Sequence, residues 1–146
     1  MTQNPLRLLL RALGLWLGGR VHRCRDLDGL GLEDRGERFV AFRRVEVEPD
    51  AGQSRGPAGM FRVRFRFKNL PIGVNKLLSL IPIPLIVAQP GFRSKTWLLG
   101  EEHGEFIGRY EFDTVEQAEA YWDSLPLRMM RRRAAPETLT KDVSSV

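Results

Sequence analysis

The chain has 146 residues, the length of about one domain, and it is 42% hydrophobic and 28% charged, which excludes a disordered composition. Its net charge of +5 is compatible with binding to nucleic acid or to a membrane surface, but acidic residues are interleaved with the arginines along most of the sequence. The single cysteine, Cys24, excludes an intrachain disulfide and favours a reducing, cytoplasmic location.

Residues 5 to 17 are rich in leucine and predict a helix, with Asn4 as its N-cap and Pro5 at its first position. The segment is too short to span a membrane, and Arg7 and Arg11 interrupt it. Two interpretations stay open. The helix docks on the domain or on a partner subunit, or it is a basic amphipathic helix that makes a peripheral contact with a membrane surface.

The chain from residue 20 to residue 59 is expected to form a loop, a strand and a linker. Residues 20 to 37 are polar and contain several glycines, which predicts a loop with little regular structure. Residues 38 to 48 alternate as a strand does. Most of the apolar residues of this strand share one parity: Phe39, Ala41, Val45 and Val47. Residues 49 to 59 are rich in Gly and Pro and predict a linker between an N-terminal extension (1–59) and a compact domain (60–146).

The clearest pattern in the chain runs from Met60 to Lys68. Phe61, Val63, Phe65 and Phe67 alternate there with Arg62, Arg64, Arg66 and Lys68. Only a β-strand separates two such sets onto opposite faces. One face therefore belongs to a hydrophobic core, and the other carries a row of like charges that must meet water or acidic partners.

Helices and strands alternate in the rest of the compact domain. A helix is expected at residues 74 to 81 with an apolar stripe, and residues 83 to 87 form either a bent helix or an extended segment that caps the core. Strands are expected at residues 92 to 99 and 105 to 113, with a hairpin loop between them. The stripe of the first helix consists of Val74, Leu77, Leu78 and Ile81.

A second helix is expected at residues 115 to 125, and it begins with a capping box formed by Thr114 and Gln117. Pro126 is expected to kink or interrupt it, and three arginines, residues 131 to 133, fall at the C-terminal end of its continuation, where the helix dipole favours positive charge. Residues 138 to 143 predict a short last strand. The buried stripe is expected to contain Val115, Ala118, Trp122 and Leu125.

The order strand, helix, strand, strand, helix, strand predicts an α+β fold, the ferredoxin-like plait (βαββαβ) with an antiparallel sheet. The N-terminal helix and the strand at residues 38 to 48 are additions to it. The first and third strands of the plait are then central neighbours, and both helices pack on their aromatic face. On the other face, Arg62, Arg64 and Arg66 are expected to meet Glu105 and Glu111.

Several motifs of the compact domain resemble the dimeric α+β barrel superfamily. They are the turn Pro90-Gly91-Phe92, the strand with Lys95 and Trp97, and the strand with Gly108, Tyr110 and Phe112. Within that superfamily the chain is most similar to small monooxygenase-like proteins related to antibiotic-biosynthesis monooxygenases. The resemblance covers about residues 60 to 143.

This resemblance implies a homodimer whose two sheets pair into a barrel, with a cavity between the sheet and the helices. Some members oxidise polyaromatic substrates with molecular oxygen and no metal or flavin, others degrade haem, and many have no demonstrated activity. No catalytic residue is shared widely enough to be assigned to a position of this chain.

Six aromatic side chains and one lysine are candidates for lining such a cavity: Phe65, Phe67, Lys95, Trp97, Tyr110, Tyr121 and Trp122. The alternative is that the aromatic residues are simply core. Lys95 shares the parity of Trp97, so it is expected to be drawn inward in part, where desolvation lowers the pKa of an amine and lets it act as a base or bind an anionic group. Alternatively, its stem extends and the amine reaches solvent at the sheet's edge.

No cluster of His, Cys and carboxylate residues predicts a metal site, and neither His22 nor His103 falls on a core face as a haem ligand would. No cofactor is therefore expected. An RNA-recognition motif has the same strand order, but Arg66 occupies the position of its stacking aromatic residue, and acidic residues on the third strand would repel phosphate. Nucleic acid is thus a disfavoured partner.

The sequence predicts a cofactor-independent, monooxygenase-like protein that acts on or binds a small aromatic or apolar molecule. The alternative is a non-catalytic dimeric ligand-binding or scaffold protein. Whether the chain is an enzyme stays open at this point.

Overall fold

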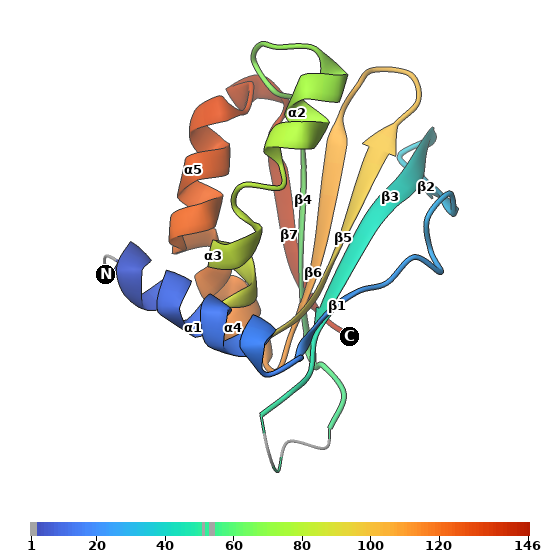
Figure 1. The fold of residues 1–146 in the computed structure, drawn as a ribbon. Helices are drawn as coiled ribbons and strands as arrows, with labels where there is room; N and C mark the ends of the chain where they lie inside the picture. Colours follow the sequence, from blue (N-terminus) through green and yellow to red (C-terminus); the bar gives the residue numbers. More distant parts are fainter. Residues whose placement is uncertain (1–2, 51, 53–54) are drawn as a thin grey trace.

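The structure is a computed structural model that describes residues 3–50, 52 and 55–146. Figure 1 shows a curved sheet with a layer of helices against one of its faces. The helices are α1 (Pro5–Leu17), α2 (Ile72–Leu78), α3 (Ile83–Val87), α4 (Val115–Ala120) and α5 (Leu125–Arg133). The strands are β1 (Val21–Arg23), β2 (Gly31–Asp34), β3 (Glu37–Val47), β4 (Gly59–Phe65), β5 (Phe92–Gly100), β6 (Phe106–Phe112) and β7 (Thr140–Ser145). None of the described helices is long and apolar enough to cross a membrane.

The sheet is antiparallel with the strand order β1-β3-β5-β6-β4-β7, and β2 pairs with β3 beside this path. The four strands β5-β6-β4-β7 and the helices between them form the predicted ferredoxin-like plait, with β4 and β6 as central neighbours. The α+β fold class is therefore confirmed. β3 extends the same sheet at the outer edge of β5 and is the additional strand that the alternation predicted.

β4 separates its side chains as the sequence predicts. Phe61 and Val63 are buried among the helix-side core residues, and Arg62 and Arg64 point to the opposite face, which we call the back face. The predicted ion pair between Arg64 and Glu105 is present at 2.5 Å.

The other predicted partners on the back face are wrong. Arg62 pairs with Asp34 of β2, Arg66 is 4.0 Å from Glu137, and Glu111 pairs with Arg44 of β3 at 3.2 Å. The sheet curves strongly enough to bring β2 over the back of β4. Asp34 and Arg44, which lie outside the plait, therefore take two of these positions.

β3 does not keep its apolar residues on one face, as their common parity implied. A register shift between Ala41 and Arg43 marks a bulge, which reverses the alternation of the strand. Phe39 and Ala41 therefore pack with Leu98 and Ile107 on the back face, whereas Val45 and Val47 join the helix-side core.

The prediction of an irregular loop at residues 20 to 37 is wrong. β1 pairs with the C-terminal half of β3 and β2 with its N-terminal half. Arg35 and Gly36 join β2 to β3 and both have positive φ, as a tight two-residue hairpin turn requires. These short polar strands have little periodicity of their own, and their pairing with β3 defines them.

The helix expected at residues 74 to 81 is shorter and is placed differently. α2 ends at Leu78, and the predicted stripe is not in the core, since Leu77 and Ile81 are each 65% exposed. The buried residue of α2 is Asn75, whose side-chain amide donates to the carbonyl oxygens of Asn69 and Leu70. Residues 83 to 87 form the helical alternative, α3, and most of its side chains are buried.

The second predicted helix is two helices. The capping box of Thr114 and Gln117 is present at the start of α4, but the helix ends before residue 125. Ser124 then caps a new helix, α5, by accepting a hydrogen bond from the amide of Leu127. Pro126 therefore lies in the first turn of α5, where its missing N–H is tolerated, and does not kink a continuous helix.

The N-terminal segment contacts the compact domain on both sides of the sheet. Ala12 and Leu15 of α1 are buried in the helix-side core, and Phe39 of β3 is buried on the back face. Residues 51, 53 and 54 of the predicted linker lie outside the described residues. The division of the chain into 1–59 and 60–146 remains a prediction for a truncation experiment.

Candidate functional site

A cavity of about 310 Å³ lies between the sheet and the helices. Its walls come from β4, β5 and β6 on one side and from α2, α3 and α5 on the other, and they are mostly apolar. Six of the seven candidate residues line it: Phe65, Phe67, Lys95, Trp97, Tyr110 and Tyr121. The seventh, Trp122, lies outside the cavity and packs at the margin of the core, where Arg131 and Lys141 cover its ring. The role of the seven candidate residues in ligand binding remains a prediction.

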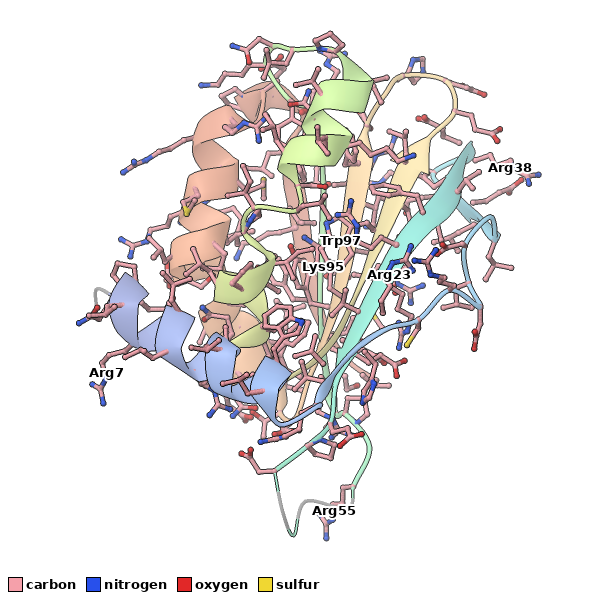
Figure 2. The ribbon with its side chains drawn as sticks, viewed as in Figure 1. Arg7, Arg23, Arg38, Arg55, Lys95 and Trp97 are labelled. Carbon is pink, nitrogen blue, oxygen red and sulfur yellow. The ribbon has the colours of Figure 1, made fainter. Side chains whose placement is uncertain are left out.

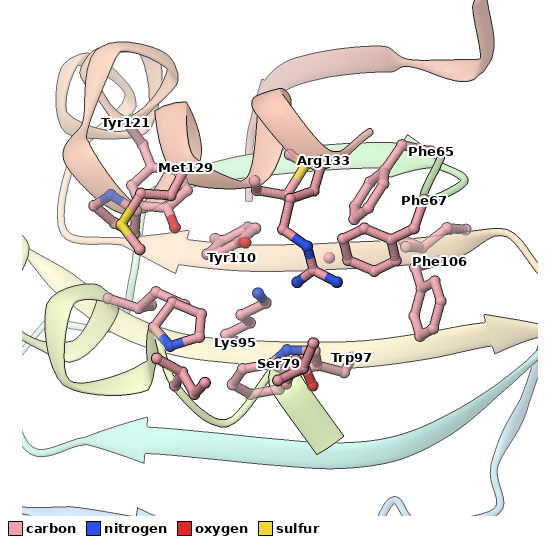
Figure 3. A pocket seen from close by; sticks show the side chains of 18 residues that line it. Phe65, Phe67, Ser79, Lys95, Trp97, Phe106, Tyr110, Tyr121, Met129 and Arg133 are labelled. Carbon is pink, nitrogen blue, oxygen red and sulfur yellow. The ribbon is translucent and has the colours of Figure 1, made fainter. Parts of the chain in front are cut away.

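Lys95 projects from the middle of β5 into this cavity, between Tyr110 and Trp97 (Figure 3). The residue is only 8% exposed, and its Nζ lies 4.3 Å from the ring centroid of Trp97 and 4.6 Å from that of Tyr110. Within the described part of the chain, no hydrogen-bond acceptor or carboxylate pairs with this amine. Burial, and secondarily the nearby charge of Arg43, holds the pKa of Lys95 well below its usual value, so the neutral amine is favoured.

Arg43 explains part of this electrostatic environment. It lies on β3 directly opposite Trp97 of β5, and its guanidinium carbon is 4.9 Å from the centroid of the Trp97 ring. Its guanidinium donates to Ser79 Oγ at 2.9 Å and to the carbonyl oxygen of Lys76 at 3.3 Å. In the sequence, Arg43 is visible only as a charged residue among apolar residues of the same parity. The bulge in β3 turns its side chain to the helix side of the sheet, where it contacts α2.

Tyr110 and Tyr121 form the aromatic floor of the cavity, with ring centroids 4.5 Å apart. Burial raises the pKa of each phenol above its usual value, so both hydroxyls stay protonated and can donate hydrogen bonds. Gly108 provides the space for the Tyr110 ring, because a Cβ at that position would lie 2.9 Å from Tyr110 Cε1. This contact is a physical reason for the spacing Gly-x-Tyr on β6.

The mouth of the cavity lies between α5 and the turn that joins α2 to α3. Ile81 and Met129 line the cavity and are also 65% and 39% exposed, so the opening passes between them. Arg133 links the two sides, since its guanidinium hydrogen-bonds to Asn75 Oδ1 and lies 4.5 Å from the centroid of the Phe67 ring. In the sequence, Arg133 is visible only as one of three arginines at a helix end, and no local signal connects it with this site.

The lining contains two cationic side chains, Lys95 and Arg133, and no acidic one. Neither histidine lines it: His22 is on β1 and pairs with Glu48 at 2.8 Å, and His103 is exposed in the β5–β6 hairpin. Among the described residues, no group of three His, Cys, Asp or Glu side chains is arranged to hold a metal ion. The arrangement can enclose a small apolar molecule and present it with the amine of Lys95 and the phenols of Tyr110 and Tyr121.

No family model matches the sequence, and no curated protein matches it. Two solved structures from Listeria monocytogenes share its fold. A heme-degrading enzyme superposes with a TM-score of 0.55 at 10% identity, over 76% of this chain and 72% of that one. A ferredoxin-fold protein related to antibiotic biosynthesis monooxygenases superposes with a TM-score of 0.56 at 9% identity, over 78% of this chain and 67% of that one. The chain therefore has the ferredoxin-like α+β fold that the order of its elements predicted, and it shares this fold with these two proteins.

Proposed function

We propose that the protein is a monooxygenase-like enzyme that acts, without a cofactor, on a small planar aromatic molecule bearing an acidic hydroxyl group. The observation that carries this proposal is Lys95. Burying an amine without a hydrogen-bond partner costs free energy, and a packed core would favour an apolar residue there. A buried amine with a lowered pKa that faces a cavity is typical of a functional site.

In this proposal, the neutral amine of Lys95 accepts the proton of the substrate hydroxyl, which gives an electron-rich aromatic anion and an ammonium ion beside it. Tyr110 donates its hydroxyl hydrogen to the substrate oxygen. The apolar walls exclude water and strengthen both contacts.

Without a cofactor, the substrate must supply all the electrons. A methylene carbon on the ionised ring system reacts with one molecule of dioxygen to give a carbonyl group and one molecule of water. One oxygen atom enters the product, the other leaves with the two hydrogens of the methylene, and Lys95 returns the proton that it accepted.

The size and lining of the cavity favour a compact ligand over haem. Its volume of about 310 Å³ is at the lower end of the range for ligand cavities, which extends to about 1,000 Å³. Haem iron is commonly held by histidine, cysteinate or tyrosinate. Neither histidine nor cysteine lines this cavity, and burial disfavours the ionised form of both lining tyrosines.

The alternative function is that of a non-catalytic ligand-binding protein, which would use the same cavity without turnover. A homodimer and a cytoplasmic location also remain proposals. The family resemblance implied pairing of two sheets, but Ile107 on the back face is only 1% exposed and packs with Phe39 and Leu98 of the same chain. Light scattering coupled to size exclusion should give about twice the chain mass of 16.7 kDa if a dimer forms.

The proposal is tested with a panel of hydroxylated naphthalenes and anthrones and their methyl ethers. The free hydroxyl compounds should raise the melting temperature of the wild type and acquire the absorption spectrum of the phenolate when bound. Only the hydroxylated anthrones, which have the methylene carbon, should also consume dioxygen. Lys95→Met should abolish the spectral change and the oxygen uptake, whereas Lys68→Met, a change at an exposed lysine, should preserve both.

Binding and spectral change without oxygen uptake would favour the non-catalytic alternative. If no aromatic compound stabilises the wild type, the cavity is only an imperfectly filled core, and both functions are excluded.

A further inference from the structure

Four of the five described α-helices have a one-sided charge, and the exception is α4, which contains Glu116 and Glu119. α1, α2, α3 and α5 contain no aspartate or glutamate, although the whole chain has 18 acidic residues. The same helices carry seven basic residues: Arg7, Arg11, Lys76, Arg128, Arg131, Arg132 and Arg133. Figure 1 shows these helices in one layer against one face of the sheet. We call this the basic helical layer. The ion pairs of Arg62 and Arg64 lie on the other face.

The basic helical layer also exposes most of the large apolar side chains that reach the surface. On α1 they are Leu6, Leu9, Leu10, Leu13, Trp16 and Leu17. In and beside α2 they are Leu70, Ile72, Val74, Leu77, Leu80 and Ile81, and on α5 Met129. Elsewhere in the described chain, only Leu30 and Val146 are comparably exposed. Apolar exposure concentrated in this way marks an interaction surface.

α1 shows why this exposure is not an accident of packing. Its buried residues, Ala12 and Leu15, form one stripe against the core, and the exposed leucines occupy the other side of the helix. The exposed Arg7 extends away from the protein (Figure 2). A surface helix with one docked face normally has a polar outer face, so the outer leucines require a partner.

We propose that the basic helical layer docks on the surface of an anionic phospholipid membrane. The leucines enter the boundary of the acyl chains while the arginines and Lys76 meet the phosphate groups. α1 has 13 residues, which suits a helix lying in the plane of the interface and not one that crosses it. The mouth of the cavity, between Ile81 and Met129, opens within the same layer, so an apolar ligand can pass from the lipid into the cavity.

A second copy of the chain is the competing occupant, and the charges argue against it. A two-fold interface brings the same patch of both subunits together. Here it would place basic side chains against basic side chains with no acidic residue from these helices between them, which is unfavourable. Anionic lipid supplies both missing components, an apolar phase and negative charge.

Vesicle co-sedimentation tests the proposal with the full chain. The protein should sediment with vesicles of phosphatidylcholine containing about 30% phosphatidylglycerol, bind pure phosphatidylcholine at least tenfold more weakly, and be released by salt, because each basic residue near an anionic surface contributes about fivefold. Leu10→Gln with Leu13→Gln should weaken binding more than tenfold, and Arg7→Gln with Arg11→Gln more than fivefold. Leu30→Gln and Arg38→Gln, at exposed positions outside the layer, are the matched controls and should bind normally.

Circular dichroism must show that the variants remain folded. Equal binding to neutral and anionic vesicles, or unchanged binding of the leucine variants, would overturn the proposal. The proposal would also be overturned if the wild type does not bind vesicles but forms a dimer, and if the double variant Leu10→Gln with Leu13→Gln dissociates that dimer. Lys95→Met should bind vesicles as the wild type does, so this surface can be correct even if the proposed reaction is not.

Discussion

The two faces of the sheet differ in how their buried cationic side chains are paired. On the back face, Arg64 contacts Asp34 at 2.6 Å, Glu37 at 3.0 Å and Glu105 at 2.5 Å, so its charge is neutralised within the chain. On the helix side, Lys95 is at least as well buried, but it faces aromatic rings and a cavity and has no such partner among the described residues. A buried charge that is fully paired is part of the architecture, whereas a buried amine left without a partner indicates a site where a ligand is expected.

The N-terminal segment has a different role on each face of the sheet. On the back face, its hairpin supplies the acidic partners of the β4 arginines and covers Ile107. On the helix side, α1 closes the core with one stripe and leaves a second apolar stripe exposed. The N-terminal segment therefore covers the back face of the sheet, whereas on the helix side it exposes an apolar surface that a partner can cover.

Removal of residues 1 to 59 affects both faces and has the largest expected effect. The truncated chain loses β3, which exposes the edge of β5, and it loses the buried contacts of Phe39 and Leu15. We expect it to show no cooperative thermal transition by circular dichroism. A cooperative melt would instead establish residues 60 to 146 as an independent domain, the division that the sequence predicts.

Trp97→Ala tests how much of the helix-side wall is structural. Trp97 is 4% exposed and contacts Arg43 and Lys95, so its removal should cost about 3 to 5 kcal/mol of unfolding free energy in urea denaturation. The half-buried Trp122 provides the control, and Trp122→Ala should cost clearly less. Equal losses would mean that the cavity wall contributes no more than the margin of the core.

Arg64→Met tests the paired charge of the back face. Three carboxylates would lose their common partner, which should cost about 3 kcal/mol at neutral pH. Burial raises the pKa of Asp34, but hydrogen bonds from Arg64 and Arg62 outweigh it and hold the pKa below its usual value. This contribution is present above the usual pKa and is lost as the pH falls through the lowered one, so the variant should lose less stability in acid than the wild type does.

The control for the Arg64 variant is Arg66→Met. The side chain of Arg66 is half exposed, and its ion pair with Glu137 is long, at 4.0 Å. A surface pair of this kind should change the unfolding free energy by less than about 1 kcal/mol. Similar losses of unfolding free energy in the two variants would show that the ion-pair network on the back face stabilises the protein no more than a surface ion pair does.

Lys95→Met tests the unpaired charge of the helix side without a ligand. The unfolded chain keeps this lysine protonated up to its usual pKa, whereas the folded protein releases the proton at a lower pH. The unfolded state therefore binds more protons between those two values, and the stability of the wild type rises with pH there. The variant should melt at a higher temperature than the wild type at pH 7, and this difference should shrink at pH 9. A constant difference would mean that the amine is charged in the folded protein.

Tyr110→Phe has the smallest expected effect. The ring volume is retained, so thermal stability should change little. A hydroxylated aromatic ligand should bind about 1 kcal/mol more weakly by calorimetry, the net contribution of a typical hydrogen bond. The methyl ether of the same ligand serves as the control, since its binding should respond less. Unchanged affinity for both compounds would exclude Tyr110 as a direct ligand contact.

The sequence by itself determined the elements whose signals are local. The alternation that begins at Met60 defines β4, although the strand ends at Phe65 and not at Lys68. The box of Thr114 and Gln117 begins α4, and each of these signals lies within a few residues. The order of these elements then leaves few topologies, of which the plait is one. Parity with Trp97 was sufficient to place Lys95 on the inner face of β5.

Only the tertiary structure decided what covers each face. Asp34 reaches Arg64 across 30 positions of sequence, and Arg133 reaches Asn75 across 58. The stripe of α2 has helical spacing, yet Leu77 remains exposed because the chain bends at Pro82 and α3 occupies the core instead. Periodicity fixes the direction of a side chain relative to its own helix or strand, but burial and pairing depend on segments that are distant in sequence and meet only when the whole sheet has curved.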